Sequence, residues 1–233
     1  MVLEHRAEMH AALGEPVRLA VAEHLLLSDA SPGELAVKLR LTTNLLAHHL
    51  KVLEDAGLVR RRRSAGDLRR SYVQLCLDDP DVVALMGLSA ASVSPPSKGG
   101  HVVFVCTHNS ARSQLAAAAW ERVSATPARS GGTHPAARVH PRAVRTAGRH
   151  GLRIDRARTA HVDDVVGSGD LVISVCDQAH EELSADPRAM PQLHWAVPDP
   201  VPADTDAAFE AAYEEIHQRV DRLAAALAPR VNG

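Results

Sequence analysis

Cys106 opens a segment whose residue types suit chemistry on an oxyanion. Its thiolate would be a nucleophile, and Arg112, six residues later, carries a planar guanidinium that can bind two oxygens of an anion. Ser113 can donate a hydrogen bond to the thiolate, and Asn109 tolerates the left-handed backbone of a tight loop. We therefore take Cys106, Arg112, Ser113 and Asn109 as candidate catalytic residues. The expected oxyanion-binding loop comprises Thr107, His108, Asn109, Ser110, Ala111 and Arg112.

A strand and a helix are expected on either side of this loop. Residues 101–105, of which the last four are apolar, predict a short buried strand that leads into Cys106. Residues 114–120 predict the start of a helix. Loop amides and the positive end of a helix can surround an oxyanion and stabilise a thiolate. This position makes the common Cys-x5-Arg spacing specific. The alternative is a buried structural cysteine beside a surface arginine.

These residues resemble the low-molecular-weight phosphotyrosine phosphatase fold and its arsenate reductase branch, over nearly all of residues 101–233. Residues 128–135, 138–144 and 170–175 extend the resemblance. It implies an α/β domain with a doubly wound, four-stranded parallel sheet. It also implies a late Asp-Pro pair as general acid, which is Asp199-Pro200 here, after the strand-like residues 193–197. Asp199 as a plain turn residue is the alternative.

Neighbouring residues favour reductase over phosphatase. The phosphatases sandwich a phenol ring between aromatic side chains that follow the Asp-Pro pair, whereas Val201, Pro202 and Ala203 follow it here. Gln114 and the sequence of residues 107–110 also look like the reductase branch. The resemblance thus implies that Cys106 attacks arsenate and that a second thiol takes over the adduct. Protein-tyrosine phosphatase activity is kept as an alternative.

Cys176 is a candidate for that second thiol. It follows the strand expected at residues 170–175 and matches the first of two later cysteines of thioredoxin-linked relatives, but residues 177–183 contain no second one. Either Cys176 forms a disulfide with Cys106, or an external thiol such as mycothiol or glutathione resolves the adduct. A thioredoxin system is a further possible reductant. Cys176 as a core residue is equally open, and neither a bound cofactor nor a metal is expected.

Residues 89–100 are small, with two prolines and two glycines, which predicts a flexible linker. We place an amino-terminal domain at 1–88 and a second domain at 101–233. In the first, apolar spacing and turn residues predict helices at about 17–27, 32–39 and 44–56, then two strands around a turn at 64–67. Ser31 and Glu34 predict a capping box.

Basic residues accumulate in this domain: nine lysines and arginines lie between Lys38 and Arg70 against three acidic residues. Residues 19–75 are similar to the winged helix-turn-helix of the arsenic- and metal-responsive (ArsR-type) repressors, most clearly at 47–59. The resemblance implies a homodimer that binds double-stranded DNA through this domain. The candidate DNA-binding residues are Thr43, Asn44, His48, Lys51, Arg61 and Arg69. The alternative is a solvated basic surface.

His49 lies beside the apolar stripe of its helix, so we expect it to be structural. Cys76 is expected on a strand as a small buried hydrophobic residue. The chain shows no signal peptide and no stretch of about 18 apolar residues, which predicts a cytoplasmic protein without a membrane partner.

Our hypothesis is thus an arsenic-responsive transcriptional regulator fused to a thiol-dependent arsenate reductase. The alternative is a DNA-binding regulator whose second domain only senses an oxyanion.

Overall fold

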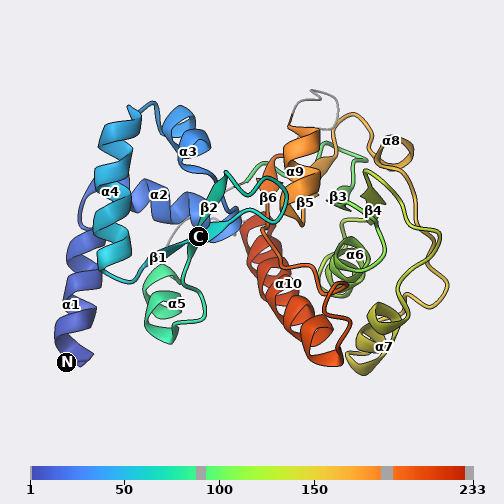
Figure 1. Cartoon of the computed structure of the whole chain (residues 1–233). Helices are drawn as coiled ribbons and strands as arrows, with labels where there is room; N and C mark the ends of the chain where they lie inside the picture. Colours follow the sequence, from blue (N-terminus) through green and yellow to red (C-terminus); the bar gives the residue numbers. More distant parts are fainter. Residues whose placement is uncertain (1, 88–92, 185–190, 229–233) are drawn as a thin grey trace. The chain divides into compact units, whose positions relative to one another are not determined.

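The computed structural model describes residues 2–87, 93–184 and 191–228. The chain folds as an amino-terminal unit, residues 1–64 with 68–91, and a carboxy-terminal unit that is chiefly residues 92–233. Figure 1 labels the elements of each unit. The expected linker at 89–100 falls partly outside the described residues, as does Leu88, where the expected first domain ends.

The described residues of the amino-terminal unit form five helices and two strands (Figure 1): α1 Val2–Leu13, α2 Pro16–Leu27, α3 Pro32–Leu39, α4 Thr43–Asp55, α5 Pro80–Met86, β1 Val59–Arg63 and β2 Ser71–Leu75. Its core is aliphatic, with Leu25, Leu35, Leu46, Leu50 and Leu53 all buried. The last three are spaced by four and three residues, so that they share one face of α4.

The helix starts follow from their capping residues. Ser31 and Glu34 form the predicted capping box at α3: the Ser31 hydroxyl accepts from Glu34 N at 3.2 Å, and the Glu34 carboxylate accepts from Ser31 N at 2.7 Å. At α4, the Thr42 hydroxyl accepts from Leu45 N at 3.3 Å. The helix therefore begins at Thr43, one residue before the predicted start.

β1 and β2 pair antiparallel, with Val59 opposite Leu75 and Arg63 opposite Ser71. Cys76 was predicted on a strand as a buried residue, and this was wrong in part. It follows the last residue of β2 and is half-buried, although its amide still donates to Leu58 O at 3.0 Å. Burial raises the pKa of the Cys76 thiol, so the thiolate is disfavoured there.

A four-stranded, fully parallel sheet forms the centre of the carboxy-terminal unit, as predicted. Its strands are β3 Val102–Cys106, β4 Ala128–Gly132, β5 Leu171–Ser174 and β6 Leu193–His194, in the order β4-β3-β5-β6. The strand predicted at 193–197 is shorter, since β6 contains only its first two residues.

The described residues of this unit form five helices besides the sheet (Figure 1): α6 Arg112–Val123, α7 Pro141–Arg149, α8 Val162–Val165, α9 Asp177–Leu183 and α10 Asp206–Leu227. The connections β3 to β4 and β5 to β6 run in opposite directions across the sheet. Because such crossovers are right-handed, α6 and α9 lie on opposite faces. The strand order reverses between β3 and β5, and ligands of such sheets bind at the carboxyl ends of the strands at this point.

Part of the predicted flexible linker is fixed to the carboxy-terminal unit. Ser97 N donates to Gly169 O at 2.8 Å, and Gly100 N donates to Ser97 O at 2.7 Å. Gly169 has a φ of 88°, and the turn before β5 thereby offers its carbonyl to the linker. Among the described residues, no helix is long and apolar enough to span a membrane.

Candidate active site

The Cys106 thiol lies at the carboxyl end of β3 and is buried. Its sulfur is 3.1 Å from Ser113 Oγ and 3.2 Å from the backbone nitrogen of Asn109, which donates to it. Ser113 Oγ already accepts from Asn109 Nδ2 at 2.9 Å, so its own proton is available to the sulfur. Two donors therefore face the position where a thiolate would carry its charge.

Asn109 shapes the loop. Its φ of 49° is the left-handed conformation predicted for it, and its side chain is fully buried. The Oδ1 atom accepts from Ala160 N at 2.9 Å and from Gln114 Nε2 at 3.1 Å. Gln114 also donates to Arg158 O at 3.0 Å, which ties the loop to the segment before α8. The side-chain amide of Asn109 thus stabilises its own left-handed backbone conformation, through Oδ1 as acceptor and Nδ2 as donor.

The carbonyl groups of the loop are bound from outside. Thr107 O, His108 O and Ser110 O accept from the amides of His134, Ala136 and His140 at 2.8 to 2.9 Å. Because a peptide unit is planar and trans, the amide that follows each carbonyl points the opposite way. The amides of His108, Asn109 and Ala111 are therefore directed away from residues 134–140, as a cradle for an anion requires.

Arg112 begins helix α6, whereas the sequence predicted it in the loop. Its guanidinium is buried and donates from Nη1 to Val197 O at 3.0 Å, while Nη2 lies 3.0 Å from Asp199 Oδ2. Val197 had no predicted role. Its carbonyl fixes one nitrogen of the fork that would bind the oxyanion.

The electrostatic surroundings of Arg112 are dominated by groups of the same site. Burial alone lowers the pKa of Arg112, but the Cys176 and Cys106 thiols and the Asp199 and Asp177 carboxyls outweigh it, and the net pKa is raised. The guanidinium is therefore a permanent positive charge between two thiols and two carboxyl groups.

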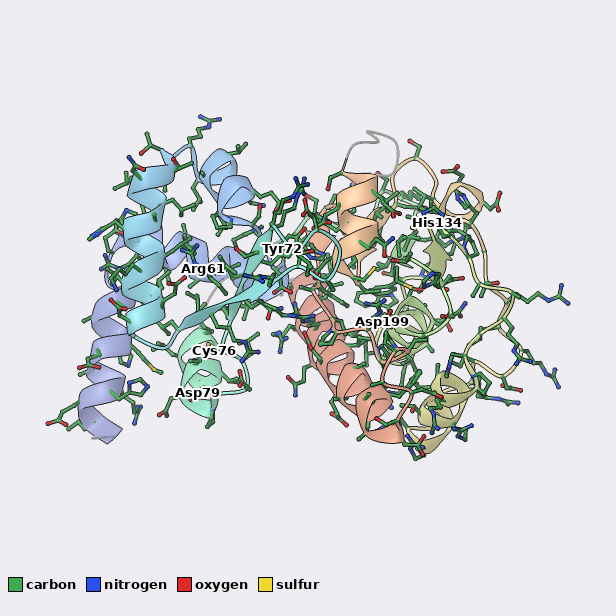
Figure 2. The ribbon with its side chains drawn as sticks, in the orientation of Figure 1. Arg61, Tyr72, Cys76, Asp79, His134 and Asp199 are labelled. Carbon is green, nitrogen blue, oxygen red and sulfur yellow. The ribbon has the colours of Figure 1, made fainter. Side chains whose placement is uncertain are left out.

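Asp199, which Figure 2 labels, lies in the loop between β6 and α10. Its carboxylate faces Arg112. Its Oδ1 atom accepts from Val201 N at 3.1 Å, and Oδ2 faces the guanidinium. The side chain thus shapes its own turn and also lies at the site, so its place in a turn does not conflict with the predicted role as general acid. Asp199 is 30% exposed, which leaves it accessible to a proton from solvent.

Cys176 follows β5 by two residues and occupies the amino-terminal cap of α9. It is buried and free, and its sulfur is 3.4 Å from Thr107 Oγ1 in the anion loop. Burial raises the pKa of the Cys176 thiol, and the positive charge of Arg112 opposes this. The structure thus brings Cys176 to the site that contains Cys106, as one sequence hypothesis required.

A buried polar network at the ends of β5 and β6 was not predicted. His194 Nε2 lies 3.0 Å from Asp177 Oδ1, and Ser174 Oγ lies 3.0 Å from His194 Nδ1 and 3.1 Å from His180 Nδ1. No spacing in the sequence indicates that strand ends twenty residues apart meet in this way.

No metal is assigned to the described residues. His150, Glu210 and Glu214 are close enough to share an ion, but His150 already pairs with Glu210, which also binds Arg149 at 2.9 Å.

Four of the residues predicted to contact DNA lie on α4, and the other two follow it in β1 and the β1–β2 turn. All are exposed: Thr43, Asn44, His48, Lys51, Arg61 and Arg69. Lys51 Nζ donates to Asp55 Oδ1 at 3.0 Å. Arg61, which Figure 2 labels, donates from Nε to Glu54 Oε1 at 2.5 Å. His49 is buried as predicted, with Nδ1 3.4 Å from Glu15 Oε2.

Comparison with known proteins gives the family of the carboxy-terminal unit. The family model for low molecular weight phosphotyrosine protein phosphatase matches residues 101–232. The chain belongs to this family. Curated relatives include an arsenate reductase from Brevibacillus brevis, 29% identical over 132 residues, with 53% of this chain and 92% of the relative covered. Another is an arsenate reductase from Halalkalibacterium halodurans, 29% identical over 137 residues, covering 53% and 94%.

Solved structures support the fold. A YwlE mutant from Bacillus subtilis matches with a TM-score of 0.50 and 20% identity, covering 56% of this chain and 99% of that one. YwlE arginine phosphatase with a phosphorylated active-site serine matches with a TM-score of 0.51 and 19% identity, covering 56% and 97%. In this phosphatase family fold, the loop from Cys106 to Ser113 lies at the carboxyl end of β3, where the strand order reverses.

Proposed function

We propose that the carboxy-terminal unit is a thiol-dependent arsenate reductase. The observation that carries the proposal is the Cys106 thiol, which lies in an anion cradle with the guanidinium of Arg112 and with a second thiol, Cys176, against the same loop. A hydrolytic phosphatase needs only the first thiol, since water completes its reaction. A reductase needs two electrons, which a second thiol supplies.

The reaction is then a substitution followed by a reduction. The Cys106 thiolate attacks arsenic, Asp199 protonates a departing oxygen, which leaves as water, and a sulfur–arsenic(V) bond forms. A second thiolate next attacks Cys106 Sγ. The electron pair of the sulfur–arsenic bond passes to arsenic, which leaves as arsenite, and the two sulfurs become a disulfide. Arg112 and the loop amides bind the oxyanion throughout.

The aromatic residues argue against phosphotyrosine as substrate. Every Phe, Tyr and Trp between residues 101 and 233 is buried: Phe104, Trp120, Trp195, Phe209 and Tyr213. None is available to stack on a phenol ring, and the residues after Asp199-Pro200 are aliphatic. Arsenate needs only the cradle, and the arsenate reductase relatives agree with this choice.

An assay of arsenate turnover tests the proposal and identifies the reductant. Purified protein is incubated with arsenate and either thioredoxin with its reductase, glutathione or mycothiol, and arsenite is measured. Cys106→Ser should abolish turnover, whereas Cys76→Ser, a matched change in the amino-terminal unit, should leave it intact. Loss of activity in Cys176→Ser would assign the second thiol to this chain; retained activity would assign it to the external thiol. An active Cys106→Ser variant would refute the mechanism.

For the amino-terminal unit we propose a winged helix-turn-helix that binds DNA as a homodimer and regulates transcription in response to arsenic. Its support is the exposed polar edge of α4, from Thr43 to Lys51, followed by a basic antiparallel pair. The ion pairs of Lys51 and Arg61 are exposed and therefore weak, so both side chains can exchange them for phosphates.

DNA binding is tested by fluorescence anisotropy over a salt series, and the dimer by light scattering. Lys51→Ala and Arg61→Ala should weaken binding and reduce its salt dependence. Arg156→Ala removes an exposed arginine of the carboxy-terminal unit and is the matched control. If all three variants bind DNA equally well, the face that carries Lys51 and Arg61 is not the DNA-binding surface. If the carboxy-terminal unit only senses an oxyanion, the affinity for DNA should still depend on arsenate in the Cys106→Ser variant, which has no turnover.

A further inference from the structure

Asp204 lies in the loop that carries Asp199, just before α10. It has a φ of 43°, a left-handed conformation that asparagine, aspartate and glycine adopt most readily. Its amide donates to Pro200 O and Val201 O, both at 3.1 Å. Asp204 therefore closes the turn that begins at Pro200, directly after Asp199.

The Asp204 side chain reaches across to the start of α7. Its Oδ1 atom accepts from Arg142 Nε at 2.7 Å and lies 3.7 Å from His140 Nε2. His140 Nδ1 accepts from Arg142 N at 3.2 Å, so the ring proton of neutral His140 is on Nε2, toward Asp204. The His140 ring also stacks on buried Phe209 of α10, with ring centroids 4.8 Å apart.

His140 caps α7 and also contacts the anion loop, because its backbone N–H donates to Ser110 O at 2.8 Å. The contacts thus form a closed circuit. It runs from the anion loop through His140 to Asp204, along the turn to Asp199, and back to the anion loop through Arg112.

We propose that Asp204 is a positioning residue, which holds Asp199 at the distance from Arg112 that proton transfer to the departing oxygen requires. The inference rests on the proposed general-acid role of Asp199. Positioning of this kind matters because a displacement of about 1 Å in a reacting group can reduce turnover about 100-fold.

Two variants of Asp204 and one matched control test the proposal. Asp204→Asn preserves shape and left-handed preference but removes the charge, and Asp204→Gly removes the side chain while permitting the positive φ. The control is Glu210→Gln. Like Asp204, Glu210 binds an arginine of α7, with Arg149 Nη2 2.9 Å away. Unlike Asp204, it lies in α10 and outside the loop that carries Asp199.

The first measurement is amide hydrogen exchange over residues 199–204, which needs no substrate. Val201 N donates to Asp199 Oδ1, so displacement of the loop exposes this amide. We expect faster exchange in Asp204→Gly than in Asp204→Asn, and exchange at the level of the unaltered protein in Glu210→Gln. Exchange in Asp204→Gly equal to that of the control would overturn the proposal.

The second measurement is a double-mutant cycle with Asp199→Asn, read as kcat for arsenate turnover. Asp204→Gly should lower kcat about 10- to 100-fold when Asp199 is present and have little further effect once Asp199 is replaced. Additive losses of kcat would mean that Asp204 does not act through Asp199. This result would also overturn the proposal. If the unaltered protein does not reduce arsenate, the proposed function fails, while amide exchange still decides whether Asp204 holds the loop.

Discussion

Replacement of Asn109 by alanine should destabilise the carboxy-terminal unit by more than the loss of a surface amide would. The buried Asn109 side chain accepts from Ala160 N at 2.9 Å and from Gln114 Nε2 at 3.1 Å, and donates to Ser113 Oγ at 2.9 Å. Gln114 retains Arg158 O as a partner, but the amide of Ala160 loses the acceptor that Asn109 supplies. Ala160 is half-buried, and a donor that is shielded from water and loses its acceptor costs about 1–3 kcal/mol.

Backbone strain adds to this loss. At a φ of 49°, alanine carries roughly 1–2 kcal/mol of strain that asparagine tolerates better. We therefore expect Asn109→Ala to lower the free energy of unfolding by about 2–5 kcal/mol. Asn109→Gly loses the same hydrogen bonds without the strain, and should be more stable than the alanine variant by roughly 0.5–1 kcal/mol after its larger unfolded-state entropy is counted.

Urea unfolding followed by tryptophan fluorescence measures both values. The chain has two tryptophans, Trp120 and Trp195, and both are buried in the carboxy-terminal unit, so this signal reports that unit. Asn109→Asp retains the acceptor atoms and the left-handed preference, and should lie between the unaltered protein and the alanine variant. An alanine variant within about 0.5 kcal/mol of the unaltered protein would refute the claim that Asn109 braces the loop.

Three further substitutions test a contact at the site, a helix cap and a half-buried histidine. Arg112→Lys keeps the charge but cannot reproduce the fork toward Val197 and the anion, so affinity for arsenate, measured as inhibition of Cys106 alkylation, should fall about tenfold or more. Ser31→Ala should lower the stability of the amino-terminal unit by about 1 kcal/mol in urea unfolding. Burial, with a contribution from Lys38, lowers the pKa of His24 to about 4 from 6.5. Between these two pH values the unfolded chain binds a proton that the folded chain does not. The free energy of unfolding is therefore fully retained above pH 6.5 and falls by up to about 3 kcal/mol toward pH 4. His24→Gln should abolish this loss.

Local signals predicted single features of both units well. The apolar run before Cys106 became β3, the Ser31–Glu34 pair became a capping box, and Asn109 adopted the left-handed conformation. Each depends on residues close together in the chain, for which spacing and residue type are sufficient.

Contacts between distant segments could not be predicted in this way. Arg112 meets the Val197 carbonyl 85 residues away, and Arg142 meets Asp204 62 residues away. Neither acceptor has a distinctive residue type or spacing, because a backbone carbonyl is present at every position and a surface aspartate is common. Cys76 was misplaced for a local reason, since β2 ends one residue before it and the following turn leaves it half-buried.

The contact of Cys176 with the loop after Cys106 could be predicted only in part. The local part was predicted from the sequence, and the pairing of distant strands was not. The sequence predicted that each cysteine follows a strand, and in a parallel sheet all strands end at the same edge. The missing fact was that β3 and β5 are neighbours, with Val105 opposite Ser174 and Val175 N donating to Val105 O at 2.7 Å. Once that register is fixed, Cys176 emerges beside the anion loop and Thr107 contacts it, without any motif joining the two cysteines. The topology of the sheet, more than any sequence pattern, therefore makes an intramolecular disulfide between Cys106 and Cys176 the hypothesis that the Cys176→Ser variant should test first.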